Sequence, residues 1–277
     1  MEGSRTAGGF DFTGRTVVLT GGAGVLGRAI AVGLAEAHAN LVILDRDFEG
    51  AQAAVSALAN SKGKHLAVGG DVLDRTSMEQ SLQEILKSYT RVDILINGAG
   101  GNNPRATTSA DLAFFDIPAD ALRFVSDLNL LGTIIPSQVL GKQMVAQKEG
   151  VILNISSMNA FRPLTRIPAY SAAKAAVSNF TLWLAVHMAQ EYSTNIRVNA
   201  IAPGFFLTEQ NRFLLTSKET GELTPRGKSI LAHTPMNRFG DPADLIGAVL
   251  YLLSPLSSFV TGVVLPIDGG FSAYSGV

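Results

Sequence analysis

Short hydrophobic runs alternate along the chain with longer segments of helical periodicity. The runs are continuously apolar, which is typical of strands buried on both faces of a parallel sheet. They predict seven strands, at Thr16–Thr20, Leu41–Asp45, His65–Val68, Val92–Asn97, Gly150–Ile155, Asn195–Ala200 and Val263–Ile267. The intervening segments predict helices at about 25–38, 48–60, 75–89, 120–148, 170–192 and 242–254.

This alternation of strands and helices predicts an α/β protein. A helical crossover between parallel strands is right-handed, so successive units wind onto both faces of one sheet. We expect a single doubly wound domain over residues 11–277, with a seven-stranded, mostly parallel sheet and helices on both faces. Residues 1–10 are small and polar, and we expect them to form a flexible tail.

Two longer stretches interrupt the alternation, one near residues 100–118 and one near 205–239. Each follows the end of a predicted strand, and ligands of doubly wound sheets bind beyond the carboxyl ends of the strands. We therefore expect both stretches to border a substrate pocket, the second as a mobile lid.

Composition narrows the class of protein. The 277 residues are 47% hydrophobic and 16% charged, which suits a large core and argues against disorder. A formal net charge of −1 gives no reason to expect nucleic acid or a membrane surface as partner. The absence of cysteine excludes disulfides and thiolate catalysis, and four scattered histidines predict no metal site. Without a signal-peptide pattern or a long apolar run, we expect a cytoplasmic protein.

The first predicted strand leads into a glycine-rich turn at the start of a helix. Gly22, Gly24 and Gly27 spell G-x-G-x-x-G in this context. Such glycines let backbone N–H groups approach a pyrophosphate at the helix N-terminus, as in Rossmann dinucleotide sites. A glycine-rich turn that merely packs the helix on the strand is the alternative.

Asp45 ends the second predicted strand, where an acidic side chain can accept hydrogen bonds from an adenosine ribose. A carboxylate there repels a 2′-phosphate and favours NAD(H) over NADP(H), whereas Arg28 or Arg46 could pair with that phosphate. Asp71, after the third strand, can touch the adenine. Either aspartate could instead cap the following helix, in the second case the one near Arg75. The small residues of Asn97-Gly98-Ala99-Gly100 let a nucleotide lie against the backbone, or form an ordinary turn.

A second group of residues carries acid–base chemistry. Tyr170 and Lys174 share one helix face, and a nearby ammonium favours the phenolate. Ser157 ends the fifth strand and can hydrogen-bond a substrate oxygen while the phenol passes a proton, although Ser156 is an alternative. Asn129 lies inside a predicted helix, either to hold a water beside the lysine or to cap a local kink.

Taken together, these residues resemble the short-chain dehydrogenase/reductase superfamily from Phe12 to about Gly270. The resemblance implies a homotetramer and a catalytic tetrad of Asn129, Ser157, Tyr170 and Lys174. The cofactor residues it implies are Gly21, Gly24, Val25, Leu26, Gly27, Asp45, Arg46, Asp71, Val72, Asn97, Gly98, Ala99, Tyr170, Lys174, Pro203, Gly204, Phe206 and Thr208. Val25 stands where the family's loop usually has its second glycine, so we expect the phosphate contact there to be rearranged.

The segments NGAGGNNPRATT, PGFFLTEQNRFLL and FVTGVVLPIDGGFSAYSGV resemble more narrowly the sugar-acid branch of D-mannonate oxidoreductases, or fructuronate reductases. That resemblance implies NADH-dependent reduction of D-fructuronate to D-mannonate. A hexuronate requires a cation for its carboxylate and amides for its hydroxyls. The candidates are Asn102, Asn103, Arg105, Asn159, Arg162 and Gln210, with Arg105 and Arg162 favoured for the carboxylate and Arg166 and His233 as further possibilities.

Three alternatives stay open. The substrate could be another polyol or keto sugar of the gluconate type, or a 3-oxoacyl thioester, because the tetrad does not read the remote part of a substrate. A non-catalytic nucleotide-binding regulatory protein could also use this fold. The proton relay argues against that last alternative, because a pure binder does not need one.

Overall fold

A computed structural model describes residues 10–207, 215–217 and 220–276 of the chain. Its seven strands form one sheet in the order β3-β2-β1-β4-β5-β6-β7, and every neighbouring pair is parallel. The strands are β1 (Thr16–Thr20), β2 (Asn40–Asp45), β3 (His65–Gly69), β4 (Ile94–Asn97), β5 (Gly150–Ile155), β6 (Ile196–Pro203) and β7 (Val264–Ile267). The predicted doubly wound, seven-stranded fold is confirmed, with a sheet that is entirely parallel.

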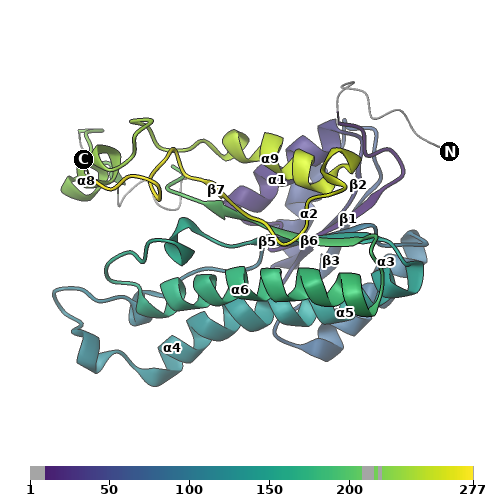
Figure 1. Cartoon of the computed structure of the whole chain (residues 1–277), viewed down its shortest axis with the longest axis horizontal. Coiled ribbons are helices and arrows are strands. Elements are labelled where there is room, and N and C mark those ends of the chain that lie inside the picture. The colour runs from purple at the N-terminus through teal and green to yellow at the C-terminus, as the bar shows by residue number, and fades with distance from the viewer. Residues whose placement is uncertain (1–9, 208–214, 218–219, 277) are drawn as a thin grey trace.

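Helices cover both faces of this sheet (Figure 1). One face carries α1 (Val25–Glu36), α2 (Phe48–Ser56) and α9 (Ile246–Leu253). The other carries α3 (Arg75–Ser88), α5 (Gly132–Gln147) and α6 (Pro168–Glu191), with α4 (Ala119–Ser126) leading into α5. None of the described helices is both long and apolar enough to cross a bilayer.

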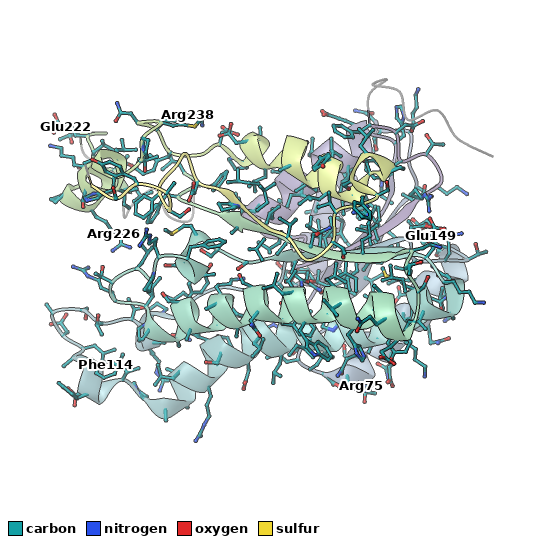
Figure 2. The ribbon with its side chains drawn as sticks, in the orientation of Figure 1. Arg75, Phe114, Glu149, Glu222, Arg226 and Arg238 are labelled. Atoms are coloured by element: carbon teal, nitrogen blue, oxygen red, sulfur yellow. The ribbon has the colours of Figure 1, made fainter. Side chains whose placement is uncertain are left out.

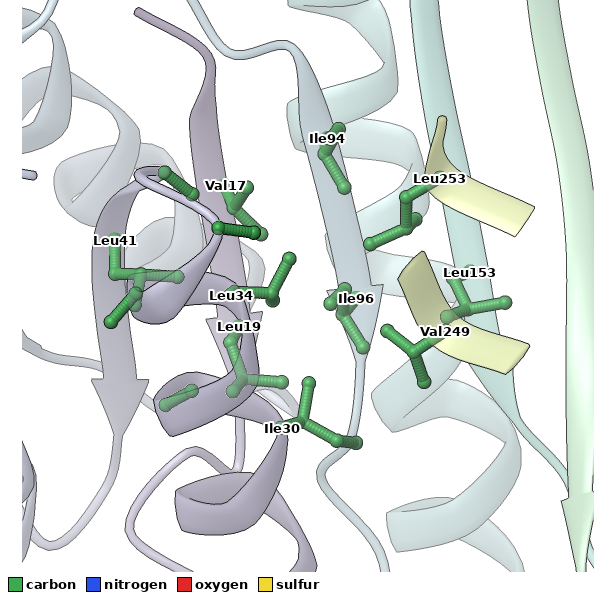
Figure 3. Close-up of a cluster of buried hydrophobic side chains, with 14 of the residues drawn as sticks. Val17, Leu19, Ile30, Leu34, Leu41, Ile94, Ile96, Leu153, Val249 and Leu253 are labelled. Atoms are coloured by element: carbon green, nitrogen blue, oxygen red, sulfur yellow. The ribbon is translucent and has the colours of Figure 1, made fainter. Parts of the chain in front are cut away.

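The two cores explain the continuous apolar pattern of the strands. In β1, Val17 and Leu19 belong to the core beneath α1 and α9, whereas Val18 belongs to the core on the opposite face. Successive strand residues point to opposite faces, so a strand covered on both sides must be apolar at every position. Figure 3 shows the first core, where Leu34 of α1 and Val249 of α9 lie over the strands.

The structure differs from the predicted elements in three places. The predicted helix over 120–148 is divided into α4, a π-helical segment at Asp127–Leu131, and α5. The stretch 205–239 contains an unpredicted helix, α8 (Pro225–Ala232). Phe10, the last residue of the predicted tail, packs against the first core, while residues 1–9 lie outside the described part of the chain.

All-parallel pairing places every strand's carboxyl end at one edge of the sheet. The segments preceding α4 and α6 gather with α8 at the same end of the molecule (Figure 1). Loops that are far apart in sequence therefore meet there, and this end of the sheet holds the candidate site.

Candidate active site

A cleft of about 520 Å³ runs along the carboxyl ends of the strands, and most of the predicted cofactor residues line it together with Ser157, Tyr170 and Lys174. It is lined by Gly21, Gly24, Val25, Leu26, Gly27, Leu44, Asp45, Arg46, Gly70, Asp71, Val72, Leu73, Gly98, Ala99, Gly100, Gly101, Phe124, Leu128, Ile155, Ser156, Ser157, Tyr170, Lys174, Pro203, Gly204, Phe205 and Phe206. Of the predicted cofactor residues, Asn97 does not line the cleft and Thr208 lies outside the described residues.

The glycine turn shapes one end of this cleft. Gly21 has φ +66°, a conformation that favours glycine, and its N–H donates to the Leu44 carbonyl at 2.9 Å. A Cβ on Gly27 would lie only 2.6 Å from the Gly21 carbonyl oxygen, so α1 can approach the turn only with glycine there. By contrast, a Cβ on Gly24 would meet nothing closer than 3.3 Å.

The N-terminus of α1 faces this cleft without a side-chain cap. Val25 is the first helical residue, no side chain bonds the helix start, and the first turn has no acidic residue. Unpaired N–H groups and the positive end of the helix dipole make such an end suitable for a phosphate. Val25 thus lines the cleft at the start of the helix, where the family's usual loop has a glycine.

Asp45 is bound to the glycine turn. Its Oδ2 accepts from the Ala23 N–H at 3.1 Å and its Oδ1 from the Asp47 N–H at 3.0 Å. Asp47, not Asp45, caps α2. This arrangement leaves lone pairs of a cleft-lining carboxylate available for ribose hydroxyls.

Asp71 is likewise not a helix cap, because Asp74 caps α3. The Asp71 Oδ1 accepts instead from the Leu73 N–H at 2.9 Å, within the loop that lines the cleft. Both helix-cap alternatives from the sequence are therefore wrong.

The two arginines near Asp45 have different surroundings. Arg28 donates to the backbone carbonyls of Ala23, at 2.8 Å, and Gly50, at 3.1 Å, and it does not line the cleft. Arg46 is exposed and does line it. Arg46 is therefore the better placed of the two to meet a 2′-phosphate.

The side chain of Asn97, one of the predicted cofactor residues, points into the interior and not into the cleft. Its Nδ2 donates to Ser137 Oγ at 2.9 Å and to Asn154 Oδ1 at 2.8 Å, which ties β4 to α5 and β5. The following Gly98 and Ala99 N–H groups donate to Thr20 Oγ1. The Asn97 side chain thus stabilises the part of the sheet that lies beneath the cleft.

Ser157 and Lys174 both lie next to Tyr170. The Ser157 hydroxyl lies close enough to the phenol to lower its pKa. The Lys174 Nζ lies 5.7 Å from the centroid of the Tyr170 ring and donates to the Ile155 carbonyl at 2.7 Å. These three side chains come from the end of β5 and the first turns of α6.

The neighbouring Ser156 has a structural role. Its hydroxyl donates to the Lys174 carbonyl at 3.1 Å and lies 2.7 Å from Ser178 Oγ, so it fastens α6 to the end of β5. Because successive residues of an extended segment point to opposite sides, Ser157 is the serine that faces the phenol.

Asn129 lies fully buried in the π-helical segment. Its Nδ2 donates to the Val125 and Gly101 carbonyls, both at 2.7 Å, and its Oδ1 accepts from the Gly101 N–H at 3.2 Å. A Cβ on Gly100 would lie 2.8 Å from Asn129 Oδ1 and 3.3 Å from Lys174 Nζ, so the amide and the amine flank Gly100. The Asn129 side chain therefore joins the π-helical segment to α4 and to the loop at Gly101. A second lone pair of its Oδ1 is left for a further hydrogen bond near Gly100 and Lys174.

Burial dominates the protonation of the central pair. It lowers the pKa of Lys174 from 10.5 to about 8. It also raises the pKa of Tyr170 above its ordinary value, against the opposing effect of Ser157. Within the protein alone, burial therefore outweighs the acidifying effect that was predicted for Lys174. The reason is that burial disfavours both charged forms, and the amine donates to a carbonyl rather than to the phenol.

The predicted substrate residues of the 100–118 loop are bonded within that loop and to α4. Arg105 forms an ion pair with Asp120, with Nη1 2.9 Å from Oδ2. Asn103 Oδ1 accepts from the Arg105 N–H, and Asn102 Nδ2 donates to Thr107 Oγ1. The preference for Arg105 as the carboxylate ligand is therefore not supported by the geometry.

The other candidates have separate positions. Asn159 is buried, accepts from the Leu164 N–H at 3.0 Å and donates to Ser157 Oγ at 3.3 Å. The exposed Arg162 donates to the Ser272 carbonyl at 3.2 Å. Gln210 lies outside the described residues.

Sequence reasoning missed several residues of the site. Gly70 and Phe205 line the cleft, and Arg226 borders a second pocket beside it. Gly70 could have been found as the second glycine of a pair that ends a strand, and Phe205 from its position between two predicted residues. Thr224 and Pro225 before Arg226 are a helix-start signal that would have revealed α8.

Comparison with known proteins agrees with this geometry. A family model described as enoyl-(acyl carrier protein) reductase matches residues 21–272, which is most of the chain. The chain belongs to the short-chain dehydrogenase/reductase superfamily. Like other members of this superfamily, it is an NAD(P)-dependent oxidoreductase.

Relatives within the superfamily match nearly the whole chain. The oxidoreductase UxuB of Bacillus subtilis, whose activity is uncharacterised, is 47% identical over 276 residues, covering 96% of this chain and 98% of the relative. A crystal structure from Haemophilus influenzae with bound NAD, named provisionally as a D-mannonate oxidoreductase, has a TM-score of 0.91 and 46% identity, covering 96% and 98%. The 5-keto-D-gluconate 5-reductase of Escherichia coli K12 is 32% identical over 262 residues, covering 94% and 96%.

Proposed function

We propose that the protein is an NAD(H)-dependent reductase of a keto sugar acid, with reduction of D-fructuronate to D-mannonate as the leading reaction. One observation carries the redox part of this proposal: Ser157 and Lys174 both lie beside Tyr170, in a cleft that extends to Asp45. The provisional name of the Haemophilus influenzae relative supports the choice of substrate.

The residues of the cleft fit a dinucleotide. The uncapped start of α1 suits the pyrophosphate, and the Asp45 carboxylate suits the ribose hydroxyls. NAD(H) is favoured over NADP(H), because Asp45 would repel a 2′-phosphate and Arg28 is bonded to backbone carbonyls away from the cleft. When bound, the nicotinamide supplies or accepts the hydride at the substrate carbon.

The chain's own groups handle the proton. In the reductive direction, the Tyr170 hydroxyl donates its proton to the carbonyl oxygen of the substrate, and Ser157 hydrogen-bonds the same oxygen. A phenol whose pKa is raised by burial stays protonated at neutral pH, which suits a donor. The Lys174 ammonium lies close enough to stabilise the phenolate that remains.

The test is oxidation of NADH by pure protein against a panel of keto sugar acids, with NADPH as the parallel coenzyme. We expect turnover of D-fructuronate, faster with NADH. 5-Keto-D-gluconate belongs in the panel because the Escherichia coli relative is named for it. Strong activity on a 3-oxoacyl thioester with none on any sugar acid would overturn the substrate assignment.

We also propose that the protein is a homotetramer. The outward side of α6 exposes Leu182, Trp183 and Val186, each with roughly half of its surface accessible. Large apolar side chains gathered on one helix face are typical of an interface. Light scattering coupled to gel filtration measures the assembly directly, and a monomer at micromolar concentration would contradict this proposal.

A further inference from the structure

A second pocket, of about 310 Å³, lies beside the cleft and shares Phe205 with it. Three separate parts of the chain form its walls. Arg166 comes from the loop between β5 and α6, Arg226 and His233 come from α8 and the residue after it, and Phe271 comes from the C-terminal segment. Figure 2 shows Arg226 extending from α8 toward the loop that precedes α6.

The pocket carries unbalanced positive charge. Arg166 and Arg226 line it, and none of the described residues that line it is an aspartate or glutamate. Neither guanidinium forms an ion pair with any described residue, whereas Arg105 pairs with Asp120 and Arg238 with Asp244. Two guanidiniums in one pocket, neither of them paired with a carboxylate of the described part of the chain, suit a carboxylate ligand, which arginine can bind through two parallel hydrogen bonds.

The backbone holds Arg166 in a costly conformation. Its φ is +75°, in the left-handed region that residues with a Cβ rarely adopt. The Thr108 N–H donates to the Arg166 carbonyl at 2.9 Å, which pins the residue to the 100–118 loop. A glycine or asparagine would adopt this turn more easily, so the arginine points to a role for its side chain.

Hydrogen bonds connect this pocket to the reacting groups. Asn159 donates to Ser157 Oγ and accepts from the Leu164 N–H, and Leu164 lines the pocket two residues before Arg166. The loop that bears Arg166 is thus fixed relative to the serine beside the phenol. A substrate whose carbonyl lies at Tyr170 can extend past Phe205 into the pocket.

We propose that Arg166 and Arg226 form the subsite that binds the substrate's carboxylate, an assignment that rests on the proposed function. His233 completes the subsite. Its Nδ1 lies 2.7 Å from the Ser229 carbonyl, which can only accept, so Nδ1 carries a proton and Nε2 is left for a substrate hydroxyl. The subsite replaces Arg105 and Arg162, the arginines favoured from the sequence.

The kinetic test compares two ketones that differ at one carbon. D-Fructuronate has a carboxylate where D-fructose has a hydroxymethyl group. Arg226→Met and Arg166→Met should each lower kcat/KM for D-fructuronate about 10- to 100-fold, the loss of one charge-assisted interaction, and leave any turnover of D-fructose unchanged. Methionine keeps the Cβ, so the strain at position 166 is the same in both proteins. Arg123→Met is the matched control, because Arg123 is exposed on α4 and lines neither pocket.

A binding experiment separates this proposal from the proposed function. The Tyr170→Phe variant with NAD⁺ should turn over about 100-fold more slowly than the wild type, or slower still, so calorimetry can measure its Kd for D-mannonate and for neutral D-mannitol. Adding Arg226→Met should raise the Kd for D-mannonate about 10- to 100-fold and leave the Kd for D-mannitol unchanged. Arginine-dependent binding without turnover of D-fructuronate by the wild type would support the subsite and reject the reaction. The subsite would be overturned if neither arginine substitution changed the turnover or the binding of the sugar acid. It would also be overturned if D-mannonate did not bind at all.

Discussion

Lys174 should make the folded protein less stable near neutral pH than an apolar side chain would at the same place. Its side chain is only 4% exposed, and its pKa falls from 10.5 to about 8. At pH 7 this difference disfavours the folded state by about 3 kcal/mol, because the unfolded chain holds the proton more tightly. The penalty is present in full below the folded pKa and disappears as pH rises toward 10.5. By pH 10 it is about 1 kcal/mol.

Lys174→Met removes this penalty and one hydrogen bond. Leaving the Ile155 carbonyl without its donor costs about 1–3 kcal/mol, so we expect a net gain of between 0 and about 2 kcal/mol at pH 7. That corresponds to a rise in Tm of up to about 4 °C for a domain of this size. By pH 10 the gain should have vanished. The variant should also be inactive, since the proposed reaction needs the ammonium.

The assay is thermal or urea unfolding of both proteins at pH 7 and pH 10. The coenzyme is left out, because binding to one protein only would shift its apparent stability. Lys174→Arg serves as a control that keeps a charge at every pH. A stability difference between Lys174→Met and the wild type that is the same at both pH values would refute the reasoning.

Four further variants test the site. Tyr170→Phe should lower kcat about 100-fold or more while the Kd for NADH, measured by fluorescence, stays within a few-fold of the wild type; near-normal turnover would reject Tyr170 as the proton donor. Asp45→Ala should narrow the preference for NADH over NADPH by roughly tenfold or more in kcat/KM, because the group that repels the 2′-phosphate is gone and Arg46 remains; an unchanged coenzyme ratio would contradict this role. Ser157→Ala should lower kcat far more than Ser156→Ala does, because the Ser156 hydroxyl joins α6 to β5 and does not face the phenol; the reverse result would exchange their roles.

The local pattern of the sequence was enough to predict the fold and the nucleotide end of the cleft. Continuous apolar strands such as β1 are dictated by burial on both faces, and that property is visible one strand at a time. The turn at Gly21 and the carboxylate of Asp45 act through backbone geometry and strand ends, which are encoded over a few residues. Such features do not depend on which distant segment lies next to them.

The substrate end was decided by contacts between distant segments. Arg105 looked available in the sequence, but α4 places Asp120 against it. Arg226 lies sixty positions after Arg166, and only the packing of α8 beside the β5–α6 loop brings them to one pocket. No periodic pattern in the sequence predicts that these two arginines line the same pocket.

The protonation of Tyr170 and Lys174 also depends on contacts between distant segments. The spacing of Tyr170 and Lys174 predicts that they share a helix face, and they do. Whether the amine acidifies the phenol depends on how deeply the surrounding loops bury both groups and on the carbonyl of Ile155, which β5 supplies. Short-range sequence therefore specifies which groups meet the cleft. The folded chain decides their partners and charges, because desolvation and hydrogen bonding arise from everything packed around them.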